Sequence, residues 1–254
     1  MMHRNTGVRD REEEIISKDP MTVKRFRMDS TQDLRNLYSG QKEVLVVAME
    51  GGVVVTVGPK EFTLGEKDLC YVPRGETFSL AKKNSSPNEI VLFSAPAKLK
   101  HEAFVKRFAE TTPIESGSPP YKRKIYNMVR ETDKADRFLC GFVEGESGNW
   151  TSFPPHRHDG KPEIYVYYGM GTKFGVQTVL MEGKDSSFVV RDGDAVYFEK
   201  GYHPNVAAPG TGMNFLWVIS APPDRRDLSV EFHPEFEGMQ SGPTHLKTSV
   251  SGKD

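Results

Sequence analysis

Short runs of β-forming residues recur along the chain, and Gly, Pro and Asp separate them. Examples are EVLVVAM at 43–49, GVVVTVG at 52–58, EIYVYY at 163–168 and FGVQTVLM at 174–181. Strands of this length and spacing predict an all-β fold of antiparallel sheets, arranged as a sandwich or a barrel. The only helix we expect covers residues 97–110, AKLKHEAFVKRFAE, where apolar residues recur at helical spacing.

A stretch rich in Pro, Ser and Gly, TTPIESGSPP at 111–120, divides the chain near its middle. Its composition is typical of a linker, and 254 residues suffice for two domains of about 100 to 130 residues each. We therefore predict an N-terminal domain at 20–110, a linker at 111–123, a second domain at 124–237 and a mobile polar tail at 238–254.

The two halves share three short segments in the same order. KEVLVVAMEGG resembles PEIYVYYGMG, which places Glu43 on Glu163. EKDLCYVPRGETFSL resembles DGDAVYFEKGYHPNV, which places Asp68 on Asp194, and VLFSAPA resembles WVISAPP near the end of each half. An internal repeat of this kind predicts two similar β domains in tandem.

The charge and the cysteines limit the classes of function. Lys and Arg number 34 against 35 Asp and Glu, so no net field draws the chain to nucleic acid or to an anionic membrane. No window is apolar enough for a membrane helix or a signal peptide, and we expect a cytoplasmic protein with a small-molecule partner. Cys70 and Cys140 lack CxxC spacing and are expected to be buried free thiols.

The segment HRHDGKPE contains residues that can bind a metal. Residues i and i+2 of a strand share a face, so His156 and His158 can point to one side. The turn DGKP then lets Glu163 open the next strand beside them. His203, after the turn EKG, is the fourth candidate.

Three imidazoles and one carboxylate suit one divalent Zn, Mn, Fe, Co or Ni ion better than calcium, which prefers oxygen ligands. An HxH pair alone is more often an exposed pair on a strand, but Glu163 and His203 favour the metal. In the N-terminal half the matching positions hold Asn36, Tyr38 and Thr77. We therefore predict that the N-terminal domain binds no metal.

The pattern HxHx4E, followed by GDxxxxxxGxHxN, resembles the two-part metal motif of cupins, and the repeat resembles a bicupin. GNWTSFPPHRHD, EIYVYY and YVPRGETFSL are similar to segments of the 5-deoxy-glucuronate isomerases of inositol catabolism. That family is grouped with the 4-deoxy-L-threo-5-hexosulose-uronate ketol-isomerases of pectin breakdown. The resemblance implies two tandem antiparallel β-barrel (jelly-roll) domains.

The resemblance also implies an activity and a ligand set. The activity is a metal-dependent aldose–ketose isomerisation of a deoxy uronic acid, converting 5-deoxy-D-glucuronate to 5-dehydro-2-deoxy-D-gluconate. The pectin-pathway reaction is the alternative, because the short turn DGKP is nearer the spacing of those enzymes. The metal would be zinc, held by His156, His158, Glu163 and His203. We expect a homo-oligomer.

An isomerase also needs an acid or base and a group that binds the substrate carboxylate. Alternation from Glu163 puts Tyr165 and Tyr167 on the ligand face, and Gln177 follows on a neighbouring strand; the tyrosines could equally be aromatic residues that only fill the barrel. Asp159 is a candidate to orient a ligand histidine, although a role in the N-terminal part of the turn explains it equally well. The nearby cations that could bind the carboxylate are Arg157, Lys161, Lys173 and Lys200.

Two other classes of function remain open. A cupin with these ligands could hold iron, nickel or copper and act as an oxygenase, and it would then need dioxygen. The chain could also be a sensor or binding module for sugar acids. No helix-turn-helix pattern is present that would couple such a sensor to DNA.

Overall fold

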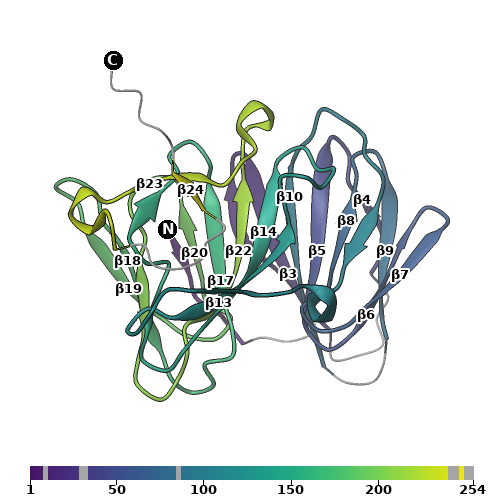
Figure 1. Ribbon diagram of the computed structural model, residues 1–254. Helices are drawn as coiled ribbons and strands as arrows, with labels where there is room; N and C mark the ends of the chain where they lie inside the picture. Colours follow the sequence, from purple (N-terminus) through teal and green to yellow (C-terminus); the bar gives the residue numbers. More distant parts are fainter. Residues whose placement is uncertain (8–10, 29–33, 84–86, 240–245, 249–254) are drawn as a thin grey trace. The chain divides into compact units, whose positions relative to one another are not determined.

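The computed structural model describes residues 1–7, 11–28, 34–83, 87–239 and 246–248 (Figure 1). These residues form β-strands and three short 3-10 turns, with no α-helix among them. The predicted all-β class is confirmed. Within the described part, no helix is long and apolar enough to cross a membrane.

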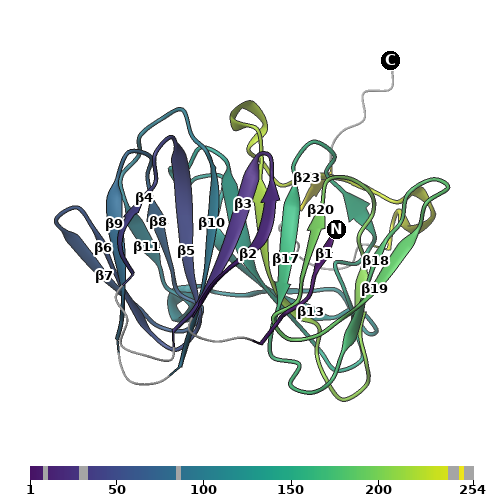
Figure 2. The same cartoon turned by 180° about the vertical axis from the view of Figure 1, so that it is seen from behind.

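Unit 1 comprises residues 1–5, 112–127 and 139–254. Its largest sheet has the order β1 (Met2–His3), β20 (Ala195–Phe198), β17 (Glu163–Tyr167), β22 (Asn214–Ser220), β14 (Phe138–Gly145), β13 (Arg123–Val129) and β12 (Ile114–Ser116). A second sheet contains β15 (Trp150–Thr151), β21 (Asn205–Ala207), β18 (Gly175–Val179) and β19 (Ser186–Val190). A third contains β16 (His156–Arg157), β23 (Ser229–Phe232) and β24 (Lys247–Thr248). Figure 2 labels β1, β20 and β17 of the first sheet, β18 and β19 of the second and β23 of the third.

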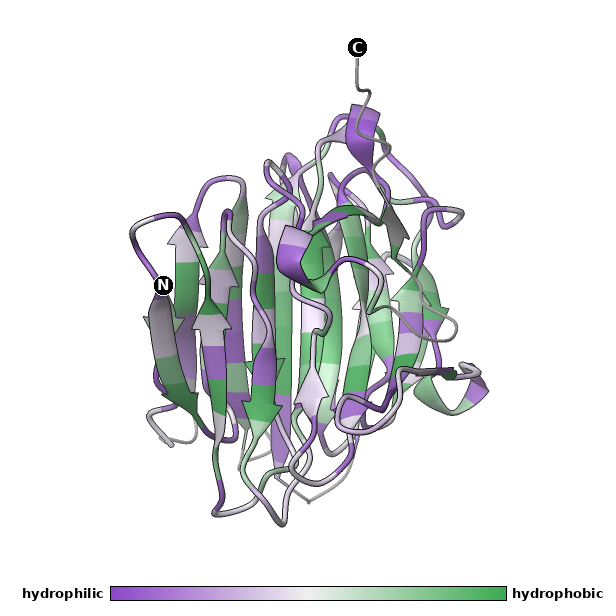
Figure 3. Ribbon diagram, turned by 60° about the vertical axis from the view of Figure 1, so that its left-hand side comes forward, coloured by the Kyte–Doolittle hydropathy of each residue, from purple (hydrophilic) through white to green (hydrophobic). Residues whose placement is uncertain are grey.

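Alternate residues of these strands fill the interior of unit 1. Tyr165 and Tyr167 of β17 and Phe215 and Trp217 of β22 belong to one buried cluster. Hydrophobic and hydrophilic bands along the strands show this alternation (Figure 3). Because successive side chains of a strand point to opposite faces, the position of Glu163 two residues before Tyr165 directs its carboxylate to the same interior.

Unit 2 comprises residues 6–111 and 128–138. One sheet has the order β11 (Phe104–Lys106), β8 (Leu69–Val72), β5 (Lys42–Glu50), β10 (Asn88–Pro96), β3 (Met21–Met28) and β2 (Arg11–Lys18). The other has the order β4 (Leu34–Tyr38), β9 (Thr77–Lys82), β6 (Val53–Val57) and β7 (Lys60–Leu64). A core of Val, Leu, Phe and other apolar residues fills the interior of unit 2, and Cys70 is buried there as a free thiol.

The helix predicted at 97–110 is wrong. Phe104–Lys106 forms β11, which pairs with β8, and a 3-10 turn follows at Phe108–Glu110. The ring of Phe104 stacks on Tyr71, with 4.8 Å between centroids. Pairing and stacking with β8 therefore override a local pattern of helical spacing.

The predicted linker and tail contain ordered elements as well. Ile114–Ser116 pairs with β13, and Leu246 precedes β24, which runs parallel to β23. Residues 240–245 and 249–254 of the tail lie outside the described residues. At the other end of the chain, Asp194 accepts hydrogen bonds from the Asn5 amide and the Arg4 guanidinium, each at 2.8 Å, so the first residues belong to unit 1.

The match of Glu43 to Glu163 is wrong by one residue. The amide of Ala48 donates to the carbonyl of Asp68, as the amide of Tyr167 donates to that of Asp194. Asp68 therefore matches Asp194 only if Val44 matches Glu163. A shift by one residue moves a side chain to the other face of its strand. Val44 belongs to the core of unit 2, and Glu43 points away from it.

Glu43 instead accepts four hydrogen bonds on the far face of β5. Its carboxylate binds the hydroxyl of Tyr71 at 2.9 Å and the amides of Asp136, Arg137 and Phe138 at 2.8, 2.8 and 3.1 Å. Burial raises the pKa of Glu43, although these hydrogen bonds oppose the rise. The carboxylate thus fastens residues 136–138 to β5 within unit 2.

We predict that Glu43→Gln lowers the free energy of unfolding by about 2 kcal/mol, because the amide offers one acceptor oxygen where the carboxylate offers two. Urea denaturation measures the change. Glu61→Gln, at an exposed position of β7, is the matched control and should stay within about 0.5 kcal/mol of the wild type. Equal effects of the two substitutions would contradict the structural role of Glu43.

Candidate metal centre and substrate pocket

The predicted metal ligands come from one short region of β16 and β17 and from the segment after β20. His156 lies in β16, and Glu163 is the first residue of β17. The amide of Lys161 donates to the carbonyl of His158 at 3.0 Å and closes the turn between the two strands. His156, Glu163 and His203 are all buried. The turn predicted from DGKP therefore brings the carboxylate back to the histidines.

Glu163 is the centre of the cluster. The Nε2 atom of His158 lies 2.9 Å from Oε2 of Glu163, and that of His203 lies 3.2 Å from the same oxygen. Ligand atoms of these three residues lie within 4.8 Å of one another. His156 is not in this group, but its ring centroid is 5.0 Å from that of His203.

Each of the three histidines is held through its Nδ1 atom by a backbone carbonyl. The contacts are His156 to Pro154 at 2.9 Å, His158 to Lys161 at 3.0 Å and His203 to Gly201 at 2.9 Å. A carbonyl oxygen can only accept, so Nδ1 carries the hydrogen. In a neutral ring Nε2 then has the free lone pair, which is the arrangement of a metal-binding histidine.

The chemistry of the cluster fits a divalent cation. Two imidazole nitrogens converge on one carboxylate oxygen, and Nε2 of His203 is buried without a hydrogen bond, although the oxygen lies 3.2 Å away. A buried polar atom without a partner is rare and costly. A cation bound by Glu163 and the Nε2 atoms would remove this cost, and the mixed nitrogen and oxygen donors suit Zn or another first-row ion.

In the protein alone, Glu163 and His158 form an ion pair. Burial would raise the pKa of Glu163, but the charge and hydrogen bond of His158 outweigh it and hold that pKa far below its usual range. Burial also lowers the pKa of His158, yet Glu163 raises it overall. Burial and then the charge of His203 keep the pKa of His156 well below 6.5, so its ring is neutral.

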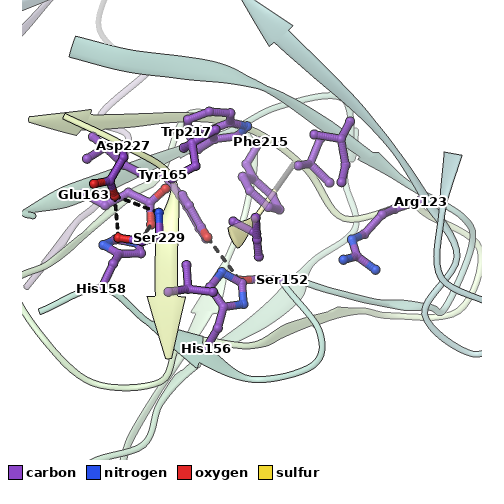
Figure 4. Close-up of a pocket in the computed structure, with 16 residues that line it drawn as sticks. Arg123, Ser152, His156, His158, Glu163, Tyr165, Phe215, Trp217, Asp227 and Ser229 are labelled. Carbon is purple, nitrogen blue, oxygen red and sulfur yellow. Dashed lines mark hydrogen bonds and ion pairs between the residues drawn. The ribbon is translucent and has the colours of Figure 1, made fainter. Parts of the chain in front are cut away.

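A pocket adjoins the cluster, and its walls are mostly apolar. Phe215, Trp217 and Ile219 of β22 line it, together with the ligands His156, His158 and Glu163. Besides these ligands, the polar side chains that line the pocket are Arg123, Ser152, Tyr165, Asp227 and Ser229 (Figure 4). A mainly apolar pocket with a few convergent polar groups is typical of a small-molecule site.

Tyr165 brings a hydroxyl into this pocket. Its ring stacks on Phe215 with 4.1 Å between centroids, and its oxygen lies 3.1 Å from Oγ of Ser152. Burial, followed by the charge of Glu163, raises the pKa of Tyr165 well above 10, so the phenol is protonated. Ser152 has φ of 51°, a left-handed conformation that is uncommon for residues other than glycine. Nothing in the sequence distinguished Ser152, because serine has no signature for this conformation.

Tyr167 and Gln177 are not among the residues that line the pocket. The Tyr167 hydroxyl donates to Oε1 of Gln177 at 2.8 Å, and the side-chain amide of Asn205 donates to the same oxygen at 2.9 Å. Nε2 of Gln177 donates to the carbonyl of His203 at 2.9 Å. These two residues therefore brace the segment that carries His203.

The cations that were expected to bind the substrate carboxylate lie outside the pocket. Nη2 of Arg157 donates to both carboxylate oxygens of Glu231, at 2.8 and 3.0 Å. The ammonium of Lys161 is buried and binds Asp227 and Ser229. Lys200 is exposed, in an open groove that also contains Arg157 and Asp159, and Lys173 is exposed as well. None of these four cations lines the pocket.

The expectation that Asp159 orients a ligand histidine is wrong. Backbone carbonyls occupy the Nδ1 side of all three rings, so no ring has an Nδ1 hydrogen left for the carboxylate of Asp159. Asp159 instead accepts from the amide of Gly201 at 3.4 Å and lies 3.8 Å from Arg157. It supports the turn before His203.

We predict that Gln177→Leu weakens zinc binding by about 10- to 100-fold, because the carbonyl of His203 loses its side-chain donor and the ring loses its fixed position. Competition with a chromogenic chelator measures the dissociation constant. Gln41→Leu is the matched control, since Gln41 is exposed in unit 2, and its affinity should equal that of the wild type. An unchanged affinity in Gln177→Leu would show that this residue does not position His203.

Curated relatives align with part of the chain. A 5-deoxy-glucuronate isomerase of Geobacillus kaustophilus is 32% identical over 163 residues, which cover 60% of this chain and 58% of that protein. A 4-deoxy-L-threo-5-hexosulose-uronate ketol-isomerase of Opitutus terrae is 29% identical over 185 residues, which cover 70% and 66%. The alignments thus span less than two thirds of the length of these relatives.

Solved structures share the fold. An IolB-like protein of Salmonella typhimurium superposes with a TM-score of 0.85 at 19% identity, over 94% of this chain and 98% of that one. A mutant of Bacillus subtilis oxalate decarboxylase gives 0.65 at 16% identity, over 86% and 75%. The sequence model of the KduI/IolB family matches residues 2–239. The chain belongs to the KduI/IolB family.

Proposed function

We propose that this protein is a metal-dependent aldose–ketose isomerase that converts 5-deoxy-D-glucuronate to 5-dehydro-2-deoxy-D-gluconate. The observation that carries the proposal is the convergence of carbonyl-tethered histidines and Glu163 at the edge of an apolar pocket that contains a tyrosine hydroxyl. Relatives named as isomerases of two uronates support the class of reaction. The ketol-isomerase reaction of pectin breakdown is the second candidate, because a relative of that name aligns over 70% of the chain.

His156, His158, Glu163 and His203 would hold one divalent ion, and zinc is the ion we expect. Bound there, the ion supplies Lewis acidity to the carbonyl and hydroxyl oxygens at the two reacting carbons. The chain supplies the surroundings. Phe215 and Trp217 exclude water from the pocket, and the carbonyl contacts to Nδ1 keep the imidazoles fixed during the reaction.

Tyr165 is the residue that we assign to proton transfer. Isomerisation moves a hydrogen between adjacent carbons while a carbonyl and a hydroxyl exchange places, so a group that donates and accepts a proton must reach the substrate. The Tyr165 hydroxyl lies in the pocket and can donate its proton to a substrate oxygen, and Ser152 at 3.1 Å can relay a proton that replaces it. Tyr167 and Gln177 would act only through His203.

Both units would be cupin barrels, divided near the predicted boundaries, and only unit 1 would be catalytic. In unit 2, Val44 stands where unit 1 has Glu163, and Thr77 stands where it has His203. A methyl-bearing side chain at the carboxylate position cannot bind a cation. We also keep the expectations of a small sugar-acid substrate, a cytoplasmic location and a homo-oligomer.

The experiment that tests the function is anaerobic incubation of zinc-loaded protein with 5-deoxy-D-glucuronate and, separately, with the pectin-derived uronate, followed by carbon NMR. We expect one aldehyde signal to be replaced by a ketone signal. His203→Ala, loaded in the same way, should lose both the zinc and the conversion.

The other outcomes separate the rival functions. Turnover that needs dioxygen would indicate an oxygenase. Tight binding of a uronate without conversion would indicate a sensor. Bound zinc with neither substrate bound nor converted would overturn the proposal.

We predict that Tyr165→Phe lowers kcat by about 100-fold or more while the zinc content stays at the wild-type level, because a proton-transfer group is lost and no metal ligand changes. Tyr167→Phe is the matched control and should lower kcat by about tenfold or less, since that hydroxyl contacts Gln177 and not the pocket. Equal losses in the two variants would contradict the role of Tyr165.

A further inference from the structure

Arg123 is a buried cation in the same pocket, and the sequence pattern did not point to it. It is the first residue of β13, and its side chain shares a face with Ile125, which belongs to the core of unit 1. Only 5% of its surface is exposed. It lines the pocket with Tyr165 and Ser152, and it lies at the opposite end from His158 and Glu163 (Figure 4).

No carboxylate of the described residues pairs with Arg123. Among the residues that the structure describes, its side chain makes one hydrogen bond, from Nη1 to the carbonyl of Tyr121 at 3.0 Å. A guanidinium has five N–H donors, so most of its capacity is unused. Arg157 and Lys161 differ in this respect, because each has a carboxylate partner in the fold.

The charge of Arg123 persists despite its burial. Burial lowers its pKa to about 10, although the neighbouring phenols of Tyr165 and Tyr121 oppose the fall, so the side chain is cationic at neutral pH. A buried cation without a counter-ion destabilises a fold. Gly117 allows the backbone to pack closely against this guanidinium, since an added Cβ there would lie 2.5 Å from the carbonyl oxygen of Tyr121 and 3.0 Å from Nη1. A ligand that brings its own negative charge would offset the cost.

The proposed substrates have that charge at the correct end. A hexuronate that isomerises at C1 and C2 carries its carboxylate at C6, at the far end of the carbon chain. If the reacting carbons lie at His158 and Glu163, the acid group extends toward the other end of the pocket. A planar guanidinium can bind a carboxylate through two parallel hydrogen bonds, and an apolar pocket strengthens them.

We propose that Arg123 binds the carboxylate of the substrate and makes the site selective for uronates over neutral sugars. This inference rests on the proposed function of the same site and names the group that recognises the acid. It replaces the sequence-based assignment of that role to Arg157, Lys161 and Lys200, which do not line the pocket.

The first test compares 5-deoxy-D-glucuronate with its neutral C6 amide as substrates of the zinc-loaded enzyme. We expect the wild type to prefer the acid. Arg123→Met keeps the length of the side chain without its charge, and it should lower kcat/KM for the acid on the order of 100-fold while the value for the amide changes only a few-fold. The preference for the acid should then disappear.

Two further variants serve as controls for the loss of any nearby cation and for the loss of the paired donors. Lys124→Met removes a neighbouring cation from the exposed face of β13 and should keep the preference for the acid. Arg123→Lys keeps a charge but not the paired donors, so its preference should be intermediate. Zinc content and thermal midpoint are measured for each variant, and Arg123→Lys carries the test if Arg123→Met does not fold.

A binding experiment separates this inference from the proposed activity. D-gluconate and D-glucitol, an acid and its neutral polyol, are titrated by calorimetry into the zinc-loaded protein, which requires no turnover. Gluconate should bind the wild type and Lys124→Met equally and Arg123→Met on the order of 30- to 100-fold more weakly, while glucitol should not distinguish them.

The two hypotheses then fail in different ways. Gluconate binding that depends on Arg123, in a protein that isomerises neither uronate, would overturn the proposed function and keep the inference. Isomerisation with an undiminished preference for the acid in Arg123→Met would overturn the inference and keep the function. Gluconate that fails to bind the wild type, or binds Arg123→Met equally, would also count against Arg123.

Discussion

Three backbone carbonyls determine the chemistry of the whole pocket. Because each accepts the Nδ1 hydrogen of a histidine, each ring has one tautomer when it is neutral and turns Nε2 inward. The carbonyl of Lys161 belongs to a tight turn and that of Gly201 to a bend next to the ligands, and that of Pro154 lies two residues before β16. Main-chain geometry, rather than acidic side chains, therefore prepares the site, and the surrounding sheet serves to hold those turns in register.

The pocket also separates its charges. Glu163 and the histidines lie at one end, Arg123 lies at the other, and the rings of Tyr165, Phe215 and Trp217 lie between them (Figure 4). The other polar side chains that line the pocket are Ser152, Asp227 and Ser229 and the hydroxyl of Tyr165, and Asp227 is already paired with Lys161. Such a pocket can distinguish the two ends of an extended molecule. An acidic end can bind Arg123, and the opposite end can bind at Glu163 and the histidines.

The sequence was informative wherever a local pattern decided the structure. Alternation of β-forming residues predicted the strands, and the spacing of His158 and Glu163 predicted that they lie side by side, since a turn and a strand are short-range features. Prediction from the sequence failed where residues distant in the chain determine the local structure. Pairing with β8 made residues 104–106 a strand, and the register of β5 turned Glu43 away from the core. Arg123 escaped notice because its distance from the ligands in sequence hides its place in the same pocket.

The left-handed backbone of Ser152 has a consequence for how this protein can change. Glycine adopts φ near 50° without strain, so Ser152→Gly would relieve the main chain and at the same time remove the hydroxyl beside Tyr165. Stability and chemistry therefore make opposite demands at one position. A serine at this position lowers the stability of the main chain and keeps a hydroxyl beside Tyr165.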